Sequence, residues 1–374
     1  MGASSAPDVA RRADPGLLSC RLDAPATGIK DGEGGPMPAN LSPEYRSAEA
    51  AYREAREPRE RLERLREMLS AIPKHKGTEH LQAEIKSRIK DLTEELGAPR
   101  KAGGHTGPVL VIRPEGAAQV ALLGPPNAGK SRLHARLTAS HAVVGPYPFA
   151  TKLPLPGMLA FEDVHIQLVD LPPITRDFME AWLPGALEQA DGALLIVDLA
   201  EADCLEQVEA IRHRLADKRI SLLEDGAPAM AEMEDDSLDP FRSRLPTLLI
   251  ANKSDQLRDP QSELEAFLEL EGVRFPALSV SAETGSGLDA VGPRLFEMLG
   301  IVRVYTRVPG HPAEHDRPFT LRRGATVRDV ARLVHRGLAS GLKHARLWGS
   351  AGFPGQHVSP EHLLRDRDVV ELHW

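Results

Sequence analysis

The chain has 374 residues and a formal net charge of −8, with 41% hydrophobic and 27% charged residues. This composition is ordinary for a globular protein, and the length predicts two or three domains. There is no run of 18 apolar residues, no apolar signal core at the N-terminus and only two cysteines. Those absences argue against transmembrane, secreted and disulfide-rich classes, so we expect a cytoplasmic protein.

Charge is distributed unevenly along the chain. Residues 102–300 contain 16 basic and 30 acidic residues, whereas residues 301–374 contain 12 basic and 7 acidic residues. The C-terminal part also holds 7 of the 14 histidines. A basic end module can contact nucleic acid even in an acidic chain, although a solvated surface explains this charge equally well.

The first hundred residues predict a tail and a helical unit. Residues 1–41 are rich in Ala, Gly, Pro and Asp without a sustained period, which predicts a disordered tail. Residues 42–101 carry Leu and Ile at helical spacing on both sides of a turn, which predicts a helical hairpin. Pro58 should break or kink any helix that precedes it. Residues 102–117 then read as a flexible linker.

The tip of this hairpin carries three basic side chains, Lys74, His75 and Lys76. They are suited to RNA phosphates, but a solvated turn accounts for them nearly as well. The sequence leaves both interpretations open.

Residues 118–300 alternate short apolar runs with helical segments. The expected strands are 120–123, 166–169, 193–197, 247–250 and 277–280. Nearly continuous hydrophobic runs are typical of strands buried on both faces, and their alternation with helices predicts a doubly wound α/β domain with a mostly parallel sheet. Residues 224–239 interrupt this pattern as an acidic surface loop.

Residues 301–374 predict a second, smaller domain. We expect short strands near 303–306 and 318–321, a helix near 327–337 and a last strand near 368–373.

A phosphate-binding loop follows the first strand of the α/β domain. The segment 124–131 fits G-x-x-x-x-G-K-[ST]. The expected nucleotide-binding residues are those of the motif and the residue that follows it: Gly124, Pro125, Pro126, Asn127, Ala128, Gly129, Lys130, Ser131 and Arg132. Backbone N–H groups of such a loop surround phosphates at the positive end of the following helix. Lys130 is expected to reach the β- and γ-phosphates, and Ser131 to bind Mg²⁺.

Two further strand ends predict the choice of base. Asn252, Lys253 and Asp255 follow one buried strand, and Ser281, Ala282 and Glu283 follow the next. A carboxylate at Asp255 can accept both N–H groups of guanine, which selects GTP and opposes an ATP-using enzyme. Asn252 and Lys253 would brace the base and the phosphate loop.

The remaining Mg²⁺ ligands are expected at Asp170 and Thr151. Asp170 ends another apolar strand, and Thr151 lies in the loop before it. With Lys130, these residues form the predicted catalytic group. All of these residues follow strands in one order, which is specific because ligands of α/β sheets bind at the carboxyl ends of strands.

With these motifs the chain resembles the Obg family of GTPases, and among them a bacterial relative of the developmentally regulated GTP-binding proteins. The segments that carry the resemblance are 126–131, 147–151, 170–172 and the hairpin turn 72–81. The C-terminal part resembles a TGS domain, a small β-grasp module, through segments 322–327, 354–356 and 366–372. The resemblance implies GTP/GDP and Mg²⁺ as ligands, slow GTP hydrolysis and association with ribosomes or RNA in translation. It implies no membrane and no DNA partner.

Two positions depart from the family pattern D-x-P-G. Pro173 stands at the glycine whose N–H senses the γ-phosphate, and proline has no N–H. Ile174 stands where a glutamine would orient the attacking water. The sequence therefore supports a slow GTPase switch, and leaves open a nucleotide-binding assembly protein with little or no turnover.

Other candidates carry alternatives. Asn127 could help to hold a K⁺ ion near the phosphates, or serve only turn geometry. Arg176 is more readily a solvated loop charge than an arginine finger, and Cys204 heads an amphipathic helix without a predicted role. The histidines of the C-terminal module lack a metal-binding spacing.

Overall fold

The computed structural model describes residues 42–55, 57–73, 78–97, 112–138, 153–224, 241–308, 311, 318–335 and 341–374. Several expectations fall outside these ranges: the tail 1–41, the hairpin tip 74–76, most of the linker 102–117, Thr151 and nearly all of the acidic loop 224–239. In the described part, no helix is long and apolar enough to cross a membrane.

Three helices form the N-terminal unit: α1 (Pro43–Glu54), α2 (Pro58–Ala71) and α3 (Glu79–Gly97). The Ser42 hydroxyl caps α1 by accepting the Tyr45 N–H at 3.1 Å, and Pro58 occupies the first turn of α2. Helices α2 and α3 are the predicted pair, and α1 is a third helix that packs on α2. Pro58 therefore separates two helices, as expected.

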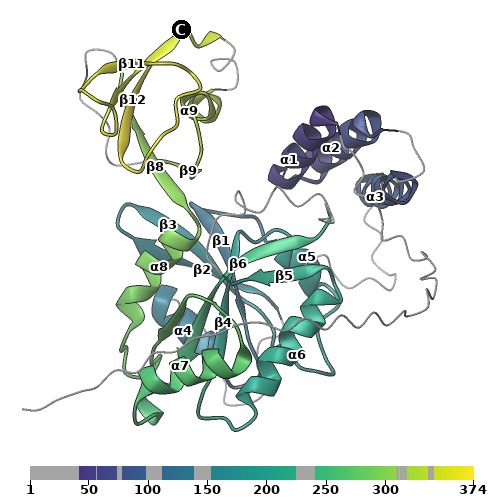
Figure 1. The fold of residues 1–374 in the computed structure, drawn as a ribbon, viewed down its shortest axis with the longest axis vertical. Helices are drawn as coiled ribbons and strands as arrows, with labels where there is room; N and C mark the ends of the chain where they lie inside the picture. The colour runs from purple at the N-terminus through teal and green to yellow at the C-terminus, as the bar shows by residue number, and fades with distance from the viewer. Residues whose placement is uncertain are drawn as a thin grey trace, which may run out of the picture.

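This helical unit is attached to the α/β domain through Phe241. The Phe241 side chain belongs to the same buried cluster as Tyr45 and Met68. The guanidinium of Arg88 lies 4.1 Å from the centre of its ring, and Arg219 of the α/β domain pairs with Glu84. Figure 1 shows the three helices beside the strands β5 and β6.

The α/β domain is built on a seven-stranded sheet. Its strands are β1 (Ala118–Leu123), β2 (Leu155–Phe161), β3 (Val164–Asp170), β4 (Gly192–Asp198), β5 (Ile220–Leu223), β6 (Ser243–Asn252) and β7 (Ala277–Ser279). The order is β2-β3-β1-β4-β6-β5, with β7 also paired to β6. All pairs are parallel except β2 with β3, so the predicted fold class is confirmed.

Helices cover both faces of this sheet. They are α4 (Lys130–Thr138), α5 (Leu183–Leu187), α6 (Cys204–Ala216), α7 (Pro260–Glu271) and α8 (Val291–Met298). Alternate residues of β1 enter opposite cores: Leu123 packs with α5, α6 and α7, and Leu122 packs with α4 and α8. The strands are therefore hydrophobic on both sides, which explains their nearly continuous apolar sequences.

The C-terminal domain has a separate five-stranded sheet in the order β11-β10-β12-β8-β9. Its elements are β8 (Ile301–Thr306), β9 (Phe319–Arg322), α9 (Val327–Val334), β10 (His344–Trp348), β11 (Gln356–Val358) and β12 (Asp368–His373). Helix α9 packs against one face of the sheet, and Thr326 and Asp329 form a capping box at its start. This sheet lies at one end of the long axis of the molecule (Figure 1).

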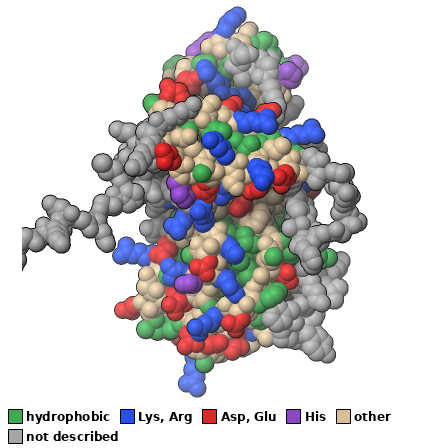
Figure 2. Space-filling view, turned by 90° about the vertical axis from the view of Figure 1, so that its right-hand side faces the viewer, with side chains coloured by type: hydrophobic (Ala, Val, Ile, Leu, Met, Phe, Trp, Pro, Cys, Tyr) green, Lys and Arg blue, Asp and Glu red, His purple; other side chains and the backbone are tan. Residues whose placement is uncertain are grey.

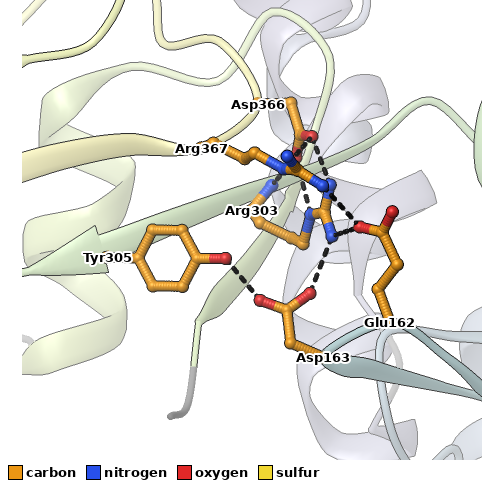
Figure 3. A network of polar contacts seen from close by, with 6 residues as sticks. All are labelled: Glu162, Asp163, Arg303, Tyr305, Asp366 and Arg367. Atoms are coloured by element: carbon orange, nitrogen blue, oxygen red, sulfur yellow. Dashed lines mark hydrogen bonds and ion pairs between the residues drawn. The ribbon is translucent and has the colours of Figure 1, made fainter. Parts of the chain in front are cut away.

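A polar network joins the two sheets (Figure 3). Arg303 on β8 has a side chain only 4% exposed, and its guanidinium pairs with Asp366 at 2.6 Å, with Asp163 at 2.7 Å and with Glu162. Glu162 and Asp163 form the turn between β2 and β3, so the C-terminal domain holds the tip of this hairpin. Burial and the Asp163 carboxylate, which accepts the phenol O–H, raise the pKa of Tyr305 to about 12.

Four strands were not predicted from the sequence: β2, β5, β10 and β11. Pro156 and Gly157 argue against a strand, and β2 tolerates them because it is an edge strand paired only to β3. The charge asymmetry of the sequence does not produce a patch of one sign on the face drawn in Figure 2, where Lys and Arg lie among Asp and Glu.

Candidate functional site

The phosphate loop connects β1 to α4 in a conformation that its glycines permit. Gly124 has φ 152° and Gly129 has φ 87°, both in the range that other residues rarely adopt. A Cβ on Gly124 would lie 2.3 Å from the Ile196 carbonyl oxygen, and one on Gly129 would lie 2.3 Å from Asn252 Nδ2. Both glycines are therefore required by close approach of the neighbouring strands.

Lys130 lies over this loop rather than in solvent. Its side chain is buried, and Nζ donates to the carbonyl oxygens of Gly124 at 3.1 Å and Pro125 at 2.7 Å. Burial lowers the pKa of Lys130 to about 8, against the opposing effect of the Asp170 carboxylate. The ammonium is thus held against the loop in a partly desolvated setting.

Ser131 and Asp170 meet at the start of α4. The Ser131 hydroxyl donates to Asp170 Oδ2 at 2.5 Å, and Asp170 is fully buried at the end of β3. A hydroxyl and a carboxylate side by side are hard oxygen donors of the kind that Mg²⁺ prefers, so the donor set fits that ion. Thr151, the third predicted ligand, lies outside the described residues.

Asn252 ties the phosphate loop to the loop after β7. Its Nδ2 donates to the Ala128 carbonyl oxygen at 2.9 Å, and its Oδ1 accepts the Ala282 N–H at 3.0 Å. The side chain is buried, so it bridges both loops from within the fold. This one amide thus connects the end of β6 to a loop 124 residues before it and to a loop 30 residues after it.

Lys253 adopts a left-handed conformation with φ 61°, and its Nζ pairs with Asp198 Oδ2 at 2.5 Å. Asp198 ends β4 and was not among the predicted site residues. The signal that singled out Asp170, an acidic residue closing an apolar strand, was also present at Asp198.

Asp255 is exposed and oriented by a neighbour. The Ser281 hydroxyl donates to Asp255 Oδ1 and accepts the Thr284 N–H at 3.1 Å. Beside it, Arg132 and Glu283 form an ion pair between α4 and the loop after β7. The predicted base-recognition residues therefore lie together, at the same sheet edge as the phosphate loop.

The segment after Asp170 runs against the phosphate loop. Pro173 and Ile174 are both buried, and the Ile174 side chain belongs to the core between the sheet and α6. The Ile174 N–H donates to the Gly124 carbonyl oxygen at 3.3 Å. Ile174 thus has a packing role, which the comparison with a water-orienting glutamine did not anticipate.

A cavity of about 780 Å³ opens beside Pro125 and Pro126, between the segment 174–177 and α6. Arg176 is exposed and lines it. Asn127 is exposed at the tip of the loop with φ 62°, a conformation that asparagine tolerates better than most residues.

His134 is a buried residue behind the site that the sequence did not reveal. It is fully buried on α4, with Nε2 3.2 Å from the Leu168 carbonyl oxygen. Burial lowers its pKa, although the Asp170 carboxylate acts in the opposite direction.

Comparison with known proteins gives matches for both domains. A family model described as "50S ribosome-binding GTPase" matches residues 119–225, and a model of the TGS domain matches residues 302–373. The first match contains the phosphate loop and Asp170, and the second covers the C-terminal sheet.

Several relatives match most of the chain. An uncharacterized GTP-binding protein of Methanocaldococcus jannaschii is 28% identical over 362 residues, which covers 84% of this chain and 92% of the relative. Developmentally-regulated G-protein 2 of Arabidopsis thaliana is 27% identical over 367 residues, with 84% and 90% covered. Developmentally-regulated GTP-binding protein 2 of Mus musculus is 25% identical over 364 residues, with 84% and 98% covered. The chain is therefore a GTP-binding protein that carries a P-loop GTPase domain followed by a TGS domain, and its homologues include the developmentally regulated GTP-binding proteins.

Proposed function

We propose that this protein is a slow, Mg²⁺-dependent GTPase that acts as a nucleotide switch on ribosomes or RNA. The observation that carries the proposal is the Asn252 bridge between the phosphate loop and the loop after β7. It joins the segment suited to phosphates to the segment suited to guanine, so that one nucleotide can span both. The motifs at 126–131 and 170–172 support placing the chain with the Obg family.

In this proposal Asp255 selects the base. Its carboxylate accepts the N–H groups of guanine, and the Ser281 hydroxyl orients this carboxylate. The neighbouring Ala282 N–H, in the loop after β7, donates to Asn252. Lys253 and Asn252 support this arrangement through Asp198 and Ala128. Adenine presents an acceptor in place of the ring N–H and would leave the carboxylate unpaired, which is costly at a binding site.

Base choice is tested by titrating guanine and xanthine nucleotides into the parent and Asp255→Asn. The variant should lose affinity for GDP at least tenfold and gain affinity for the xanthine nucleotide, because an amide presents a donor where the carboxylate accepted. Asp259→Asn is the matched control, since Asp259 is exposed four residues away and caps α7. Unchanged GDP affinity in Asp255→Asn, or equal affinity of the parent for ATP and GTP, would overturn the assignment.

The phosphates and the metal are assigned to the start of α4. Lys130 contributes positive charge at the β- and γ-phosphates, and backbone N–H groups of 124–131 surround them. Ser131, Asp170 and Thr151 would hold Mg²⁺, which neutralises charge on the phosphates when bound. Turn geometry explains the left-handed conformation of Asn127. The alternative is that its side chain helps to hold a K⁺ ion, and comparing GTP hydrolysis in K⁺ and Na⁺ buffers decides between the two.

Hydrolysis is expected to be slow for a reason visible in the site. Pro173 has no N–H, and the next N–H, that of Ile174, is used by Gly124. The Ile174 side chain is in the core and cannot orient water. These observations also favour the second candidate function, a nucleotide-binding assembly protein without turnover.

Single-turnover hydrolysis of GTP, with and without ribosomes, separates the two functions. A slow parent rate that Lys130→Ala abolishes identifies a GTPase, and stimulation by ribosomes identifies the partner. If GTP stays intact in both conditions while GDP and GTP still bind, the assembly function replaces the switch.

The partner is assigned to ribosomes or RNA through the TGS domain at 301–374 and the helical unit at 42–101. The support is the basic charge of the C-terminal segment together with the TGS match. Cosedimentation of the full chain with ribosomes should weaken as salt increases, because phosphate contacts release counterions. Failure to cosediment at low salt would remove the ribosome from the proposal.

A further inference from the structure

The two faces of the TGS sheet differ in what covers them. One face packs against α9 through alternate residues such as Val304, Leu347 and Val370. The opposite face, which we call the outer face, carries the residues between them. At the β8 end this face meets the β2–β3 turn through Arg303 and Tyr305. Among the described residues, no helix covers the rest of it.

Three histidines form a stack on the outer face. The ring of His344 lies 4.7 Å from that of His357 and 4.8 Å from that of His373, with interplanar angles of 22° and 7°. They come from β10, β11 and β12, and β10 pairs with both of the others. The chain places at least 12 residues between any two of them, so only the sheet pairing produces the stack.

Cationic side chains surround this stack. The Arg346 side chain is 46% exposed, and its Nε donates to His357 Nε2 at 3.3 Å. Farther along the sheet the Arg307 guanidinium lies 4.5 Å from the centre of the Trp348 ring. The face therefore combines flat ring surfaces with positive charge.

The single carboxylate among these side chains is already neutralised. Glu371 is 3% exposed, and Arg307, Arg346 and His373 lie 3.2, 3.7 and 2.8 Å from its oxygens. Because two guanidinium groups face one buried carboxylate, this part of the outer face carries a net positive charge even when every imidazole is neutral. A polyanion is the complementary partner.

A metal ion does not explain the histidines. Rings that are stacked in parallel direct their nitrogens sideways rather than toward a common point. No group of three metal-ligand side chains occurs in the part of the chain that the structure describes. Flat rings next to arginines instead match the two parts of a nucleotide strand, because bases stack on rings and phosphates pair with guanidinium groups.

We propose that the outer face, defined by Arg307, His344, Arg346, Trp348, His357 and His373, binds a short stretch of single-stranded RNA. Bases stack on the two rings at the ends of the stack, those of His357 and His373, because His344 between them has both ring faces covered. Phosphates pair with Arg346 and Arg307. This inference rests on the proposed RNA association of the TGS domain and assigns it to one surface. RNA is chosen because unpaired bases are the parts of RNA that proteins read by stacking.

The test measures binding of a fluorescein-labelled oligouridylate of about ten nucleotides to the full chain by anisotropy. His357→Ala should weaken binding about tenfold through lost stacking, and Arg346→Ala should weaken it and reduce the salt dependence by about one counterion. The matched controls are His335→Ala and Arg332→Ala, at and near the C-terminal end of α9 on the other side of the sheet. Both controls should bind like the parent.

Three results would overturn the assignment. If the parent binds the oligouridylate and cosediments with ribosomes but His357→Ala and Arg346→Ala match their controls, the outer face is not the site and the proposed function stands. If the parent binds neither RNA nor ribosomes, both proposals fail. If oligoglutamate or single-stranded DNA of the same length binds as tightly, and the same variants lose it, the face recognises anions without preference for RNA.

Discussion

The N–H of Ile174 donates to the carbonyl oxygen of Gly124 at 3.3 Å, so the segment after Asp170 is fastened to the phosphate loop by the first amide that follows Pro173. The same carbonyl oxygen accepts Lys130 Nζ at 3.1 Å. Pro173 has no N–H to donate, and the N–H of Ile174 already donates to Gly124. This segment therefore has few backbone donors with which to sense a γ-phosphate.

Replacing Pro173 should therefore increase discrimination between nucleotides. Pro173→Ala and Pro173→Gly both restore an N–H, and a charge-assisted hydrogen bond contributes about 1.5–3 kcal/mol, so GTP should bind roughly tenfold or more tighter relative to GDP. Paired titrations of the two nucleotides measure this ratio. Comparing the two variants separates the effect of the restored N–H from that of backbone flexibility, because only glycine adds flexibility. A parent that already prefers GTP strongly, with both variants unchanged, would show that Pro173 is neutral.

Lys130 should make nucleotide affinity depend on pH. Its pKa of about 8 means that the ammonium deprotonates as pH rises from 7 to 9, whereas bound phosphates favour the protonated form. GDP affinity should be greatest below pH 8 and fall about tenfold by pH 9. The measurement is calorimetric titration at both pH values, with proton uptake read from buffers of different ionisation enthalpy. Lys130→Arg should bind without this dependence, and a parent with constant affinity would contradict the prediction.

His134 should make the GTPase domain sensitive to acid. Burial lowers its pKa in the folded state, so the unfolded chain takes up the proton more readily. The stabilising effect of the neutral ring is present above about pH 6.5 and is lost as pH falls below that value, at no more than about 1.4 kcal/mol per pH unit.

Chemical denaturation at pH 7 and pH 5.5 measures this slope. His134→Gln keeps a donor for the Leu168 carbonyl oxygen and should reduce the slope by the contribution of one proton. His165→Gln, at an exposed position on β3, is the control and should leave the slope as in the parent. Equal slopes in the parent and His134→Gln would contradict the prediction.

Arg303 should be the most sensitive position between the two domains. Arg303→Met removes the counter-charge shared by three partly exposed carboxylates and should cost about 1.5–3 kcal/mol, because the charge-assisted hydrogen bonds between the two domains are lost. We expect the parent to melt in one thermal transition and this variant in two, because its TGS domain unfolds separately. Arg367→Ala, whose side chain is 63% exposed and pairs with Glu162, should melt nearly like the parent, because exposed ion pairs contribute little to stability. If both variants melt alike in calorimetry, Arg303 does not hold the two domains together.

The sequence was most informative where function and local pattern coincide. The five expected strands correspond to β1, β3, β4, β6 and β7, and most of them read as nearly continuous apolar runs because strands buried on both faces need apolar residues. The phosphate loop could be located for a similar reason, since positive φ and close contacts with Ile196 and Asn252 require glycine at Gly124 and Gly129. Such constraints act on consecutive residues, so they are visible in a single sequence.

Features that depend on pairing were not visible. The stack of His344 with His357 and His373 exists only because three strands are adjacent, and no spacing in the sequence announces it. Arg303 lies in a strand that reads as apolar, and its partners Glu162 and Asp163 are about 140 residues away. Edge strand β2 was missed because Pro156 weakens its local signal.

The Arg303 network also determines how truncated forms of this protein should be interpreted. A GTPase domain expressed without residues 301–374 would keep Glu162 and Asp163 as adjacent carboxylates with their counter-charge removed, at the turn of the hairpin that leads through β3 to Asp170. Repulsion there would loosen the hairpin. Binding and rate constants from such a fragment would describe an altered protein, so single surface substitutions in the full chain are the sounder means of assigning roles to its domains.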